Sequence, residues 1–159
     1  MYKAIRNSVI ALAAVAVLGA GVPAVQAAGM DNAVSARKSV MQLRGFYLGM
    51  LGGMAKGKIA YDAKKAAGAA NSLAALEQLD GSSMWLPGSG NDKLGDKTRA
   101  LPTIWSTWPA IGKNSKALKA AVANMANMAG TDLAGLRGSI GGVGKACGSC
   151  HKAFRAEKK

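Results

Sequence analysis

The stretch that constrains this chain most is Cys147-Gly148-Ser149-Cys150-His151, near the C-terminus. It has the form Cys-x-x-Cys-His, the attachment motif of a c-type haem. The two thiols of such a motif bind the haem vinyl groups as thioethers, and the histidine can reach the iron. Residues three and four apart lie on one side of a helix, so Cys147, Cys150 and His151 project toward the same flat ligand. We therefore expect one covalent haem c, with His151 as the proximal axial ligand of its iron.

The N-terminus has the layout of a secretory signal peptide. Lys3 and Arg6 precede an uncharged apolar run over residues 8–22, and Val25-Gln26-Ala27 offers a small-residue cleavage site. The run is too short for a comfortable membrane span. An uncleaved anchor and cleavage after Ala28 both stay open at this point.

We expect residues 1–27 to be removed and residues 28–159 to form one domain in the periplasm. The remaining 132 residues, 27 fewer than the 159 of the whole chain, suit one ordinary domain with a real core. No later segment is long and apolar enough to span a membrane. Export agrees with covalent haem attachment, which in bacteria occurs outside the cytoplasm.

Other roles for the two cysteines fit less well. A disulfide is the default in an exported chain, but the adjacent His151 favours thioethers. A zinc site needs four ligands, and the chain has one histidine beside its two cysteines. A thioredoxin-like redox pair needs a strand–helix–strand context that the sequence lacks.

The charge is strongly basic, with a formal net charge of +13 at pH 7. Removing Lys3 and Arg6 leaves +11, because the signal segment has no acidic residue, and two ionised haem propionates would lower this to about +9. Such a surface favours encounters with acidic redox partner proteins or an anionic membrane. Nucleic acid is not expected, because the chain is exported. A solvated basic surface with no dedicated partner stays open.

The composition is typical of an all-α protein, rich in alanine, leucine, methionine and lysine. Apolar residues at helical spacing predict four helices and a long connection over residues 80–101. Pro109 should kink the third helix or delay its regular start. Four amphipathic helices in one small domain indicate a four-helix bundle with the haem on its last helix. The predicted helices cover residues 31–56, 62–79, 102 to 125 or 128, and 131–156.

The residue on the other face of the iron decides the function. The chain has no second histidine, so the remaining good ligand is a methionine thioether, which raises the potential of such a haem. Met41 stands out, because a strip of glycines at helical spacing begins at Gly45 and would let a flat haem come close. Arg37, one turn earlier, has a fork of donors suited to a propionate. Most methionines should fill the core, and the other candidates are Met30, Met50, Met54, Met84, Met125 and Met128.

The segment 144–155 resembles the C-terminal motif of class II c-type cytochromes, the family that includes cytochromes c' and the low-spin cytochrome c-556 group. In this family the haem motif lies on the last helix. The resemblance covers nearly the whole mature chain and is weakest over residues 82–99. The other similar stretches are residues 37–41, residues 54–57 with Tyr61 and Asp62, and residues 101–105.

The resemblance implies an antiparallel four-helix bundle, with homodimers common. It also sharpens the question of the sixth ligand. In cytochromes c' the position matching Met41 is usually a non-ligating apolar residue, and the five-coordinate iron is open to NO or CO. In the c-556 group that position is a methionine that ligates the iron. Met41 follows the second pattern, and Arg155 is implied to lie near the haem.

The leading hypothesis is therefore a periplasmic monohaem cytochrome that carries single electrons, low-spin, with His151 and Met41 as axial ligands. The alternative is a five-coordinate haem protein of the cytochrome c' type that binds NO or CO. A third hypothesis is a structural or partner-binding haem subunit. We do not expect an enzyme, because the acidic residues are scattered and no catalytic acid–base pair or nucleophile stands out. Lys145 and Lys152 are expected at the surface near the haem edge.

Overall fold

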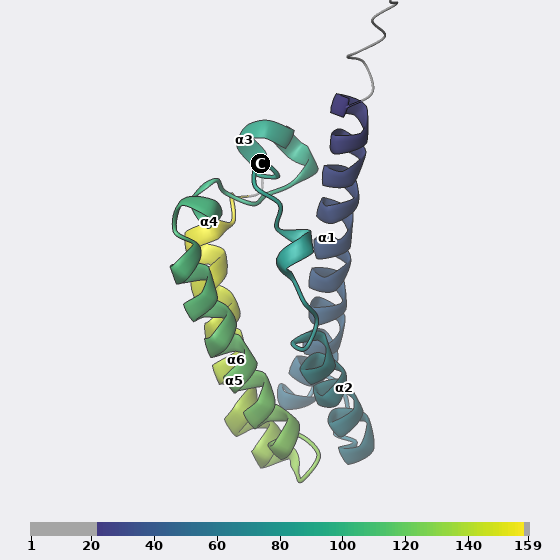
Figure 1. Ribbon diagram of the computed structural model, residues 1–159. Coiled ribbons are helices and arrows are strands. Elements are labelled where there is room, and N and C mark those ends of the chain that lie inside the picture. Colours follow the sequence, from purple (N-terminus) through teal and green to yellow (C-terminus); the bar gives the residue numbers. More distant parts are fainter. Residues whose placement is uncertain (1–21, 158–159) are drawn as a thin grey trace, which may run out of the picture.

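The computed structural model of the chain describes residues 22–157, and every long element in these residues is an α-helix (Figure 1). Four long helices form the molecule: α1 (Val22–Ala55), α2 (Ala63–Leu76), α5 (Trp108–Met128) and α6 (Leu133–Phe154). Figure 1 shows each running opposite to the one before it, with α1 beside α2 and α5 beside α6. The predicted antiparallel four-helix bundle is confirmed.

The connection between α2 and α5 is partly ordered into four short turns. They are η1 (Ser82–Met84), α3 (Asn91–Leu94), η2 (Gly95–Lys97) and α4 (Thr103–Ser106). Figure 1 shows this connection at the top of the molecule, where it lies between the two pairs of long helices. An isolated antiparallel bridge between Ala100 and Arg155 fastens it to the end of α6.

Helix boundaries follow the local capping chemistry. The Asp62 side chain caps α2 by accepting a hydrogen bond from the Lys65 amide at 2.9 Å, at the predicted start of the second helix. Pro109 lies in the first turn of α5, and the helical conformation is interrupted at Thr107 just before it. The predicted delay in the start of the third long helix is therefore confirmed.

Three predicted boundaries are wrong. Helix α6 begins at Leu133 rather than at residue 131, because the Asp132 carboxylate caps it by accepting a hydrogen bond from the Gly135 amide at 2.6 Å. Helix α2 ends at Leu76 rather than at Leu79. Helix α1 begins at Val22 and not at Asp31, since the alanine-rich residues before Asp31 continue the helix. Of the predicted signal peptide, residues 1–21 lie outside the described residues.

The hydrophobic core is divided into two clusters. The bundle cluster, in which all four long helices meet, is centred on Leu51, Met54, Leu73, Val122, Met125, Leu136 and Val143. The cap cluster consists of Ala100, Ile104 and Phe154, with Trp85, Trp105, Ile111 and Cys150 packed against them. The cap cluster lies at the C-terminal end of α6, next to the connection.

Candidate haem site

The haem motif lies within the last turns of α6, as the sequence predicts. Cys147, Cys150 and His151 are all half-buried, and both cysteines are free thiols. Cys147 packs against the bundle cluster and Cys150 against the cap cluster. The motif therefore lies where one part of the core ends and the other begins.

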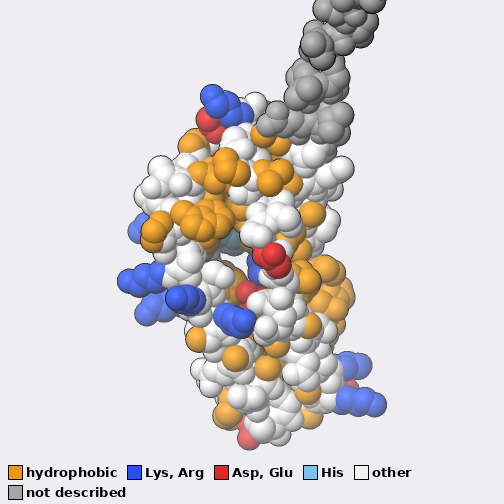
Figure 2. Space-filling view, viewed as in Figure 1, with side chains coloured by type: hydrophobic (Ala, Val, Ile, Leu, Met, Phe, Trp, Pro, Cys, Tyr) orange, Lys and Arg blue, Asp and Glu red, His pale blue; other side chains and the backbone are white. Residues whose placement is uncertain are grey.

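This interruption of the core fits a bound haem. Figure 2 shows that the molecule is hollowed between the α5–α6 pair and α1, with the pale blue of a histidine visible in the hollow. On α1, a Cβ added at Gly45 or Gly49 would meet nothing within 4 Å. A flat apolar group joined to two neighbouring thiols could fill such a space, and a half-buried imidazole beside it could bind iron.

The electrostatics of the motif suit iron binding by a neutral imidazole. Burial raises the pKa of the Cys147 and Cys150 thiols. Burial also lowers the pKa of His151, and the nearby positive charges of Arg155, Arg99 and Arg44 lower it further. A lowered pKa keeps the imidazole neutral, which is the form that can donate a lone pair to a metal.

Arg44 is a site residue that the sequence interpretation missed. Its Nε donates to Glu77 Oε1 at 2.8 Å, and the Glu77 side chain is 5% exposed. The charge of Arg44 also acts on both motif cysteines and on His151. A signal did exist in the sequence, because Arg44 follows Arg37 by seven residues and so lies two turns further on the same face of α1.

Met41 lies on α1, one turn before Arg44, and is 39% exposed. Its sulfur accepts a hydrogen bond from Arg44 Nη1 at 3.7 Å. The structure thus brings Met41 to the same side of the molecule as the charges that act on the motif.

Arg37 is buried, 4% exposed, and its guanidinium holds the long connection against α1. It donates to the Ser89 hydroxyl at 2.7 Å, to the Ser89 carbonyl at 2.6 Å and to the Thr98 hydroxyl at 2.8 Å. It also donates to the Met84 carbonyl at 3.2 Å and stacks on Trp85, 4.8 Å from the ring centroid. The guanidinium of Arg37 thus already donates to four acceptors. Its contact with a haem propionate remains a prediction.

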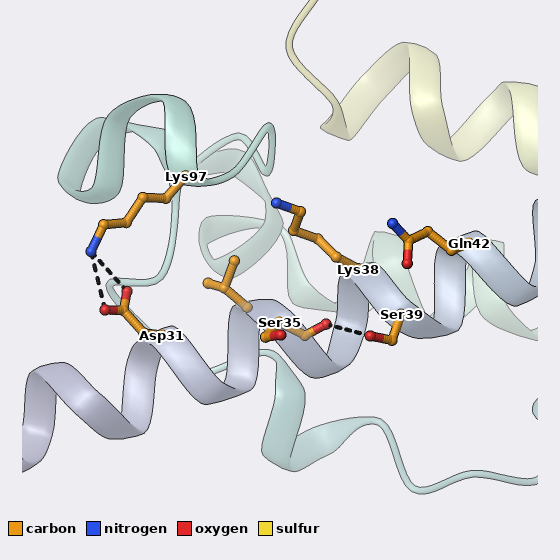
Figure 3. A pocket seen from close by; sticks show the side chains of 7 residues that line it. Asp31, Ser35, Lys38, Ser39, Gln42 and Lys97 are labelled. Atoms are coloured by element: carbon orange, nitrogen blue, oxygen red, sulfur yellow. Dashed lines mark hydrogen bonds and ion pairs between the residues drawn. The ribbon is translucent and has the colours of Figure 1, made fainter.

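A second tie joins the connection to α1 on the outside. Lys97 reaches across to Asp31 and donates to both carboxylate oxygens, at 3.0 and 3.1 Å (Figure 3). The groove beside this pair is polar and open, and it is lined along α1 by Ser35, Lys38, Ser39 and Gln42. It contains no residue of the haem motif.

Arg155 directly follows α6 and is exposed. Its charge acts on Cys150 and His151, which places it near the motif. Contact with the haem stays a prediction. Phe154, one residue earlier, is 8% exposed in the cap cluster.

Among the residues that the structure describes, no helix combines the length and the apolar character needed to cross a bilayer.

Comparison with known proteins identifies the family. A family model described as cytochrome c' matches residues 32–155, which include all four long helices from Asn32 onward and the whole haem motif. The chain belongs to the cytochrome c' family. Haem c, covalently bound and containing iron, is therefore its cofactor, and the residues at Cys147, Cys150 and His151 fit that group.

Two relatives come from Cereibacter sphaeroides. The chain is 35% identical to a cytochrome c-554 over 126 residues, which cover 79% of this chain and 82% of the relative. It is 34% identical to a cytochrome c' over 144 residues, which cover 90% of this chain and 96% of the relative. The likeness thus covers more than three quarters of this chain and of each relative.

Solved structures of cytochromes c' share the fold. Cytochrome c' from Rhodobacter spheroides superposes with a TM-score of 0.79 at 33% identity, over 81% of this chain and 98% of that one. A ferrous variant of cytochrome c' from Alcaligenes xylosoxidans with bound NO superposes with a TM-score of 0.71 at 27% identity, over 81% and 97%.

These matches correct the leading functional prediction. A low-spin electron carrier with Met41 as the sixth iron ligand is wrong, because the family model and the solved structures match cytochrome c' and do not support the c-556 group. The sequence interpretation failed at this residue for a physical reason. A methionine fills an apolar space as readily as it ligates iron, so its presence on the distal helix does not separate the two types.

Proposed function

We propose that this chain is a five-coordinate haem c protein that binds NO or CO at the open face of the iron. The observation that carries the proposal is the match to cytochrome c' over residues 32–155, which include the haem motif. The NO complex of the cytochrome c' from Alcaligenes xylosoxidans supports the choice of ligand.

The chain's own residues would divide the work between two helices. On α6, Cys147 and Cys150 would hold the haem, and the neutral imidazole of His151 would ligate the iron from the proximal side. On α1, Met41 would face the distal side as an apolar side chain that crowds the open position without ligating it. The bound haem supplies an iron atom to which a diatomic gas can coordinate. No acid, base or nucleophile is needed, so we propose no enzymatic activity.

Titration of the ferrous protein with CO tests this function. We expect a saturable change in the visible spectrum as CO coordinates the iron at its vacant position. The absence of any spectral change at saturating CO would contradict the proposal. The variant Gln42→Ala, next to Met41 but exposed, is a matched control that should bind CO as the parent does.

Residues 1–27 are proposed to direct export to the periplasm and to be removed there. This proposal depends on the basic, apolar and small-residue segments in order. Mass spectrometry of the protein from a periplasmic extract should show a chain that begins at Ala28 and carries one haem. Recovery of the full-length chain from the membrane fraction would contradict it.

The predicted homodimer also remains a proposal, and α1 offers the surface for it. Leu43 and Phe46 are 45% and 62% exposed on the face of α1 that turns away from the core. Burying them against a second copy would remove apolar surface from water. Sedimentation should show a dimer that Phe46→Glu dissociates, whereas Leu79→Glu, at a residue 52% exposed on the α2 side, should leave it intact. A monomeric parent protein would contradict the dimer.

A further inference from the structure

The face formed by α5 and α6 is cationic. Neither α5 nor α6 contains an aspartate or glutamate, and the acidic residue between them is Asp132. Four exposed lysines lie on these two helices near the haem motif, and none forms an ion pair with a described residue. We call this set the basic rim, and it consists of Lys113, Lys116, Lys145 and Lys152.

The register of the two helices places the basic rim at the level of the haem motif. A Cβ added at Gly142 would lie 3.8 Å from the Ala121 Cβ, which fixes where α6 and α5 meet. The helices run in opposite directions, so five residues back along α5 correspond to five residues forward along α6. Lys116 is therefore level with Cys147. By the same count, Lys113 is level with Cys150.

An apolar patch lies beside these lysines. Trp108 is 44% exposed at the start of α5. It lines a shallow groove together with Pro109, Gly112, Lys113 and Lys116. Figure 2 shows Lys and Arg side chains gathered over the upper part of α5 and α6, directly below hydrophobic side chains over α4 and the start of α5. An aromatic centre with a charged rim is the composition of a transient protein interface.

Lys113 and Lys116 of the basic rim differ from Lys119, which lies on the same helix α5. Lys119, one turn beyond Lys116, already donates to Gln78 Oε1 at 3.1 Å. Lys113 and Lys116 have no such hydrogen bond to a described residue. Their charges therefore act outward into solvent.

We propose that Trp108, Pro109, Lys113 and Lys116 form the docking surface for an acidic protein that reduces the iron. Charge complementarity selects an acidic surface, and the register brings it to the level of the haem attachment, which matters for electron transfer and not for membrane binding. One electron leaves the reduced centre of the partner and converts ferric iron to ferrous iron, with no bond formed or broken. The inference rests on the proposed gas-binding function, because CO binds the ferrous state that this electron produces.

Reduction by flavodoxin hydroquinone, an acidic one-electron donor protein, tests the surface. The variant Lys113→Glu/Lys116→Glu should lower the second-order rate constant for reduction of the ferric protein by ~10-fold or more at low salt, and less at high salt. The matched control is Lys56→Glu/Lys64→Glu, which makes the same change of net charge at two exposed lysines at the far end of the bundle. It should stay within about 2-fold. Equal losses in both variants would overturn a local docking surface.

Two further measurements separate docking from other effects. Equilibrium binding of oxidised flavodoxin, in which no electron can move, should weaken in Lys113→Glu/Lys116→Glu and in Trp108→Ser, and unchanged binding would overturn the proposal. The CO spectrum of the dithionite-reduced variants should match the parent, so a failure of gas binding is distinguishable from a failure of docking. If the charge reversal abolishes binding to phosphatidylglycerol vesicles but leaves flavodoxin binding intact, the surface faces a membrane and the proposal is wrong.

Discussion

The two walls of the proposed haem space, α6 and α1, are built in different ways. On α6 the working residues are Cys147, Cys150 and His151, and they stand at a fixed spacing within one turn and a half of helix. On α1 they are Arg37, Met41 and Arg44, and the two arginines are held by residues far away in the chain. The residues on α6, which we call the attaching wall, are thus placed by local helix geometry, whereas those on α1, the distal wall, depend mainly on tertiary contacts. Substitutions on the two walls should therefore fail in different ways.

The largest expected effect is on α6. Cys147→Ser/Cys150→Ser should abolish covalent haem attachment, since neither thioether bond can form. Peroxidase staining for haem on a denaturing gel should detect the parent chain and not the variant. Ser149→Ala is the control, because the Ser149 hydroxyl donates only to the Lys145 carbonyl of its own helix. Haem that stays bound to the double variant through denaturation would contradict covalent attachment at these two cysteines.

Arg37→Ala tests the support behind the distal wall. We expect a loss of about 3 kcal/mol in the free energy of unfolding, because buried acceptors at Ser89 and Thr98 lose their donor. Hydrogen exchange should accelerate over residues 82–99. The exposed neighbour provides the control, and Lys38→Ala should change the stability by less than about 0.5 kcal/mol. An Arg37→Ala variant with unchanged stability and unchanged hydrogen exchange over residues 82–99 would show that Arg37 does not hold the connection in place.

Met41→Ala tests the distal wall itself. Shortening this side chain should raise the association rate constant for CO by about tenfold, equivalent to ~1.4 kcal/mol in the barrier, while the ferric spin state stays the same. Flash photolysis or stopped flow gives the rate. Leu43→Ala, on the outer face of α1, should leave it unchanged. A slower CO reaction in Met41→Ala would show that Met41 does not crowd the gas.

An effect smaller than that of Arg37→Ala is expected at the ion pair between α1 and the end of α2. Arg44→Gln should cost about 1–2 kcal/mol of stability, because the nearly buried Glu77 carboxylate loses its charged partner. Adding Glu77→Gln should recover part of that loss. Chemical denaturation of both single variants and the double variant gives the coupling energy, and strictly additive losses would mean that the pair contributes nothing.

The fold and the position of the haem motif on the last helix could be predicted because they depend on short-range patterns. Helical spacing of apolar residues identified the four long helices, and Pro109 itself indicated the delayed start of the third. The spacing within Cys147–His151 placed two thiols and an imidazole on one side of α6.

The distal site could not be predicted in the same way. Nothing local to Arg37 shows that Ser89 and Thr98, more than fifty residues away, supply its acceptors. Nothing local to Arg44 shows that Glu77 is its partner. The role of Met41 depends on whether its sulfur ligates iron or only fills space, and the residue type is compatible with both.

The absorption spectrum of the ferric protein, as purified with its haem, tests the central claim most directly. A five-coordinate iron with His151 as its axial ligand predicts a high-spin spectrum that Met41→Ala leaves high-spin. A low-spin spectrum with a methionine–iron charge-transfer band, lost in Met41→Ala, would contradict the account.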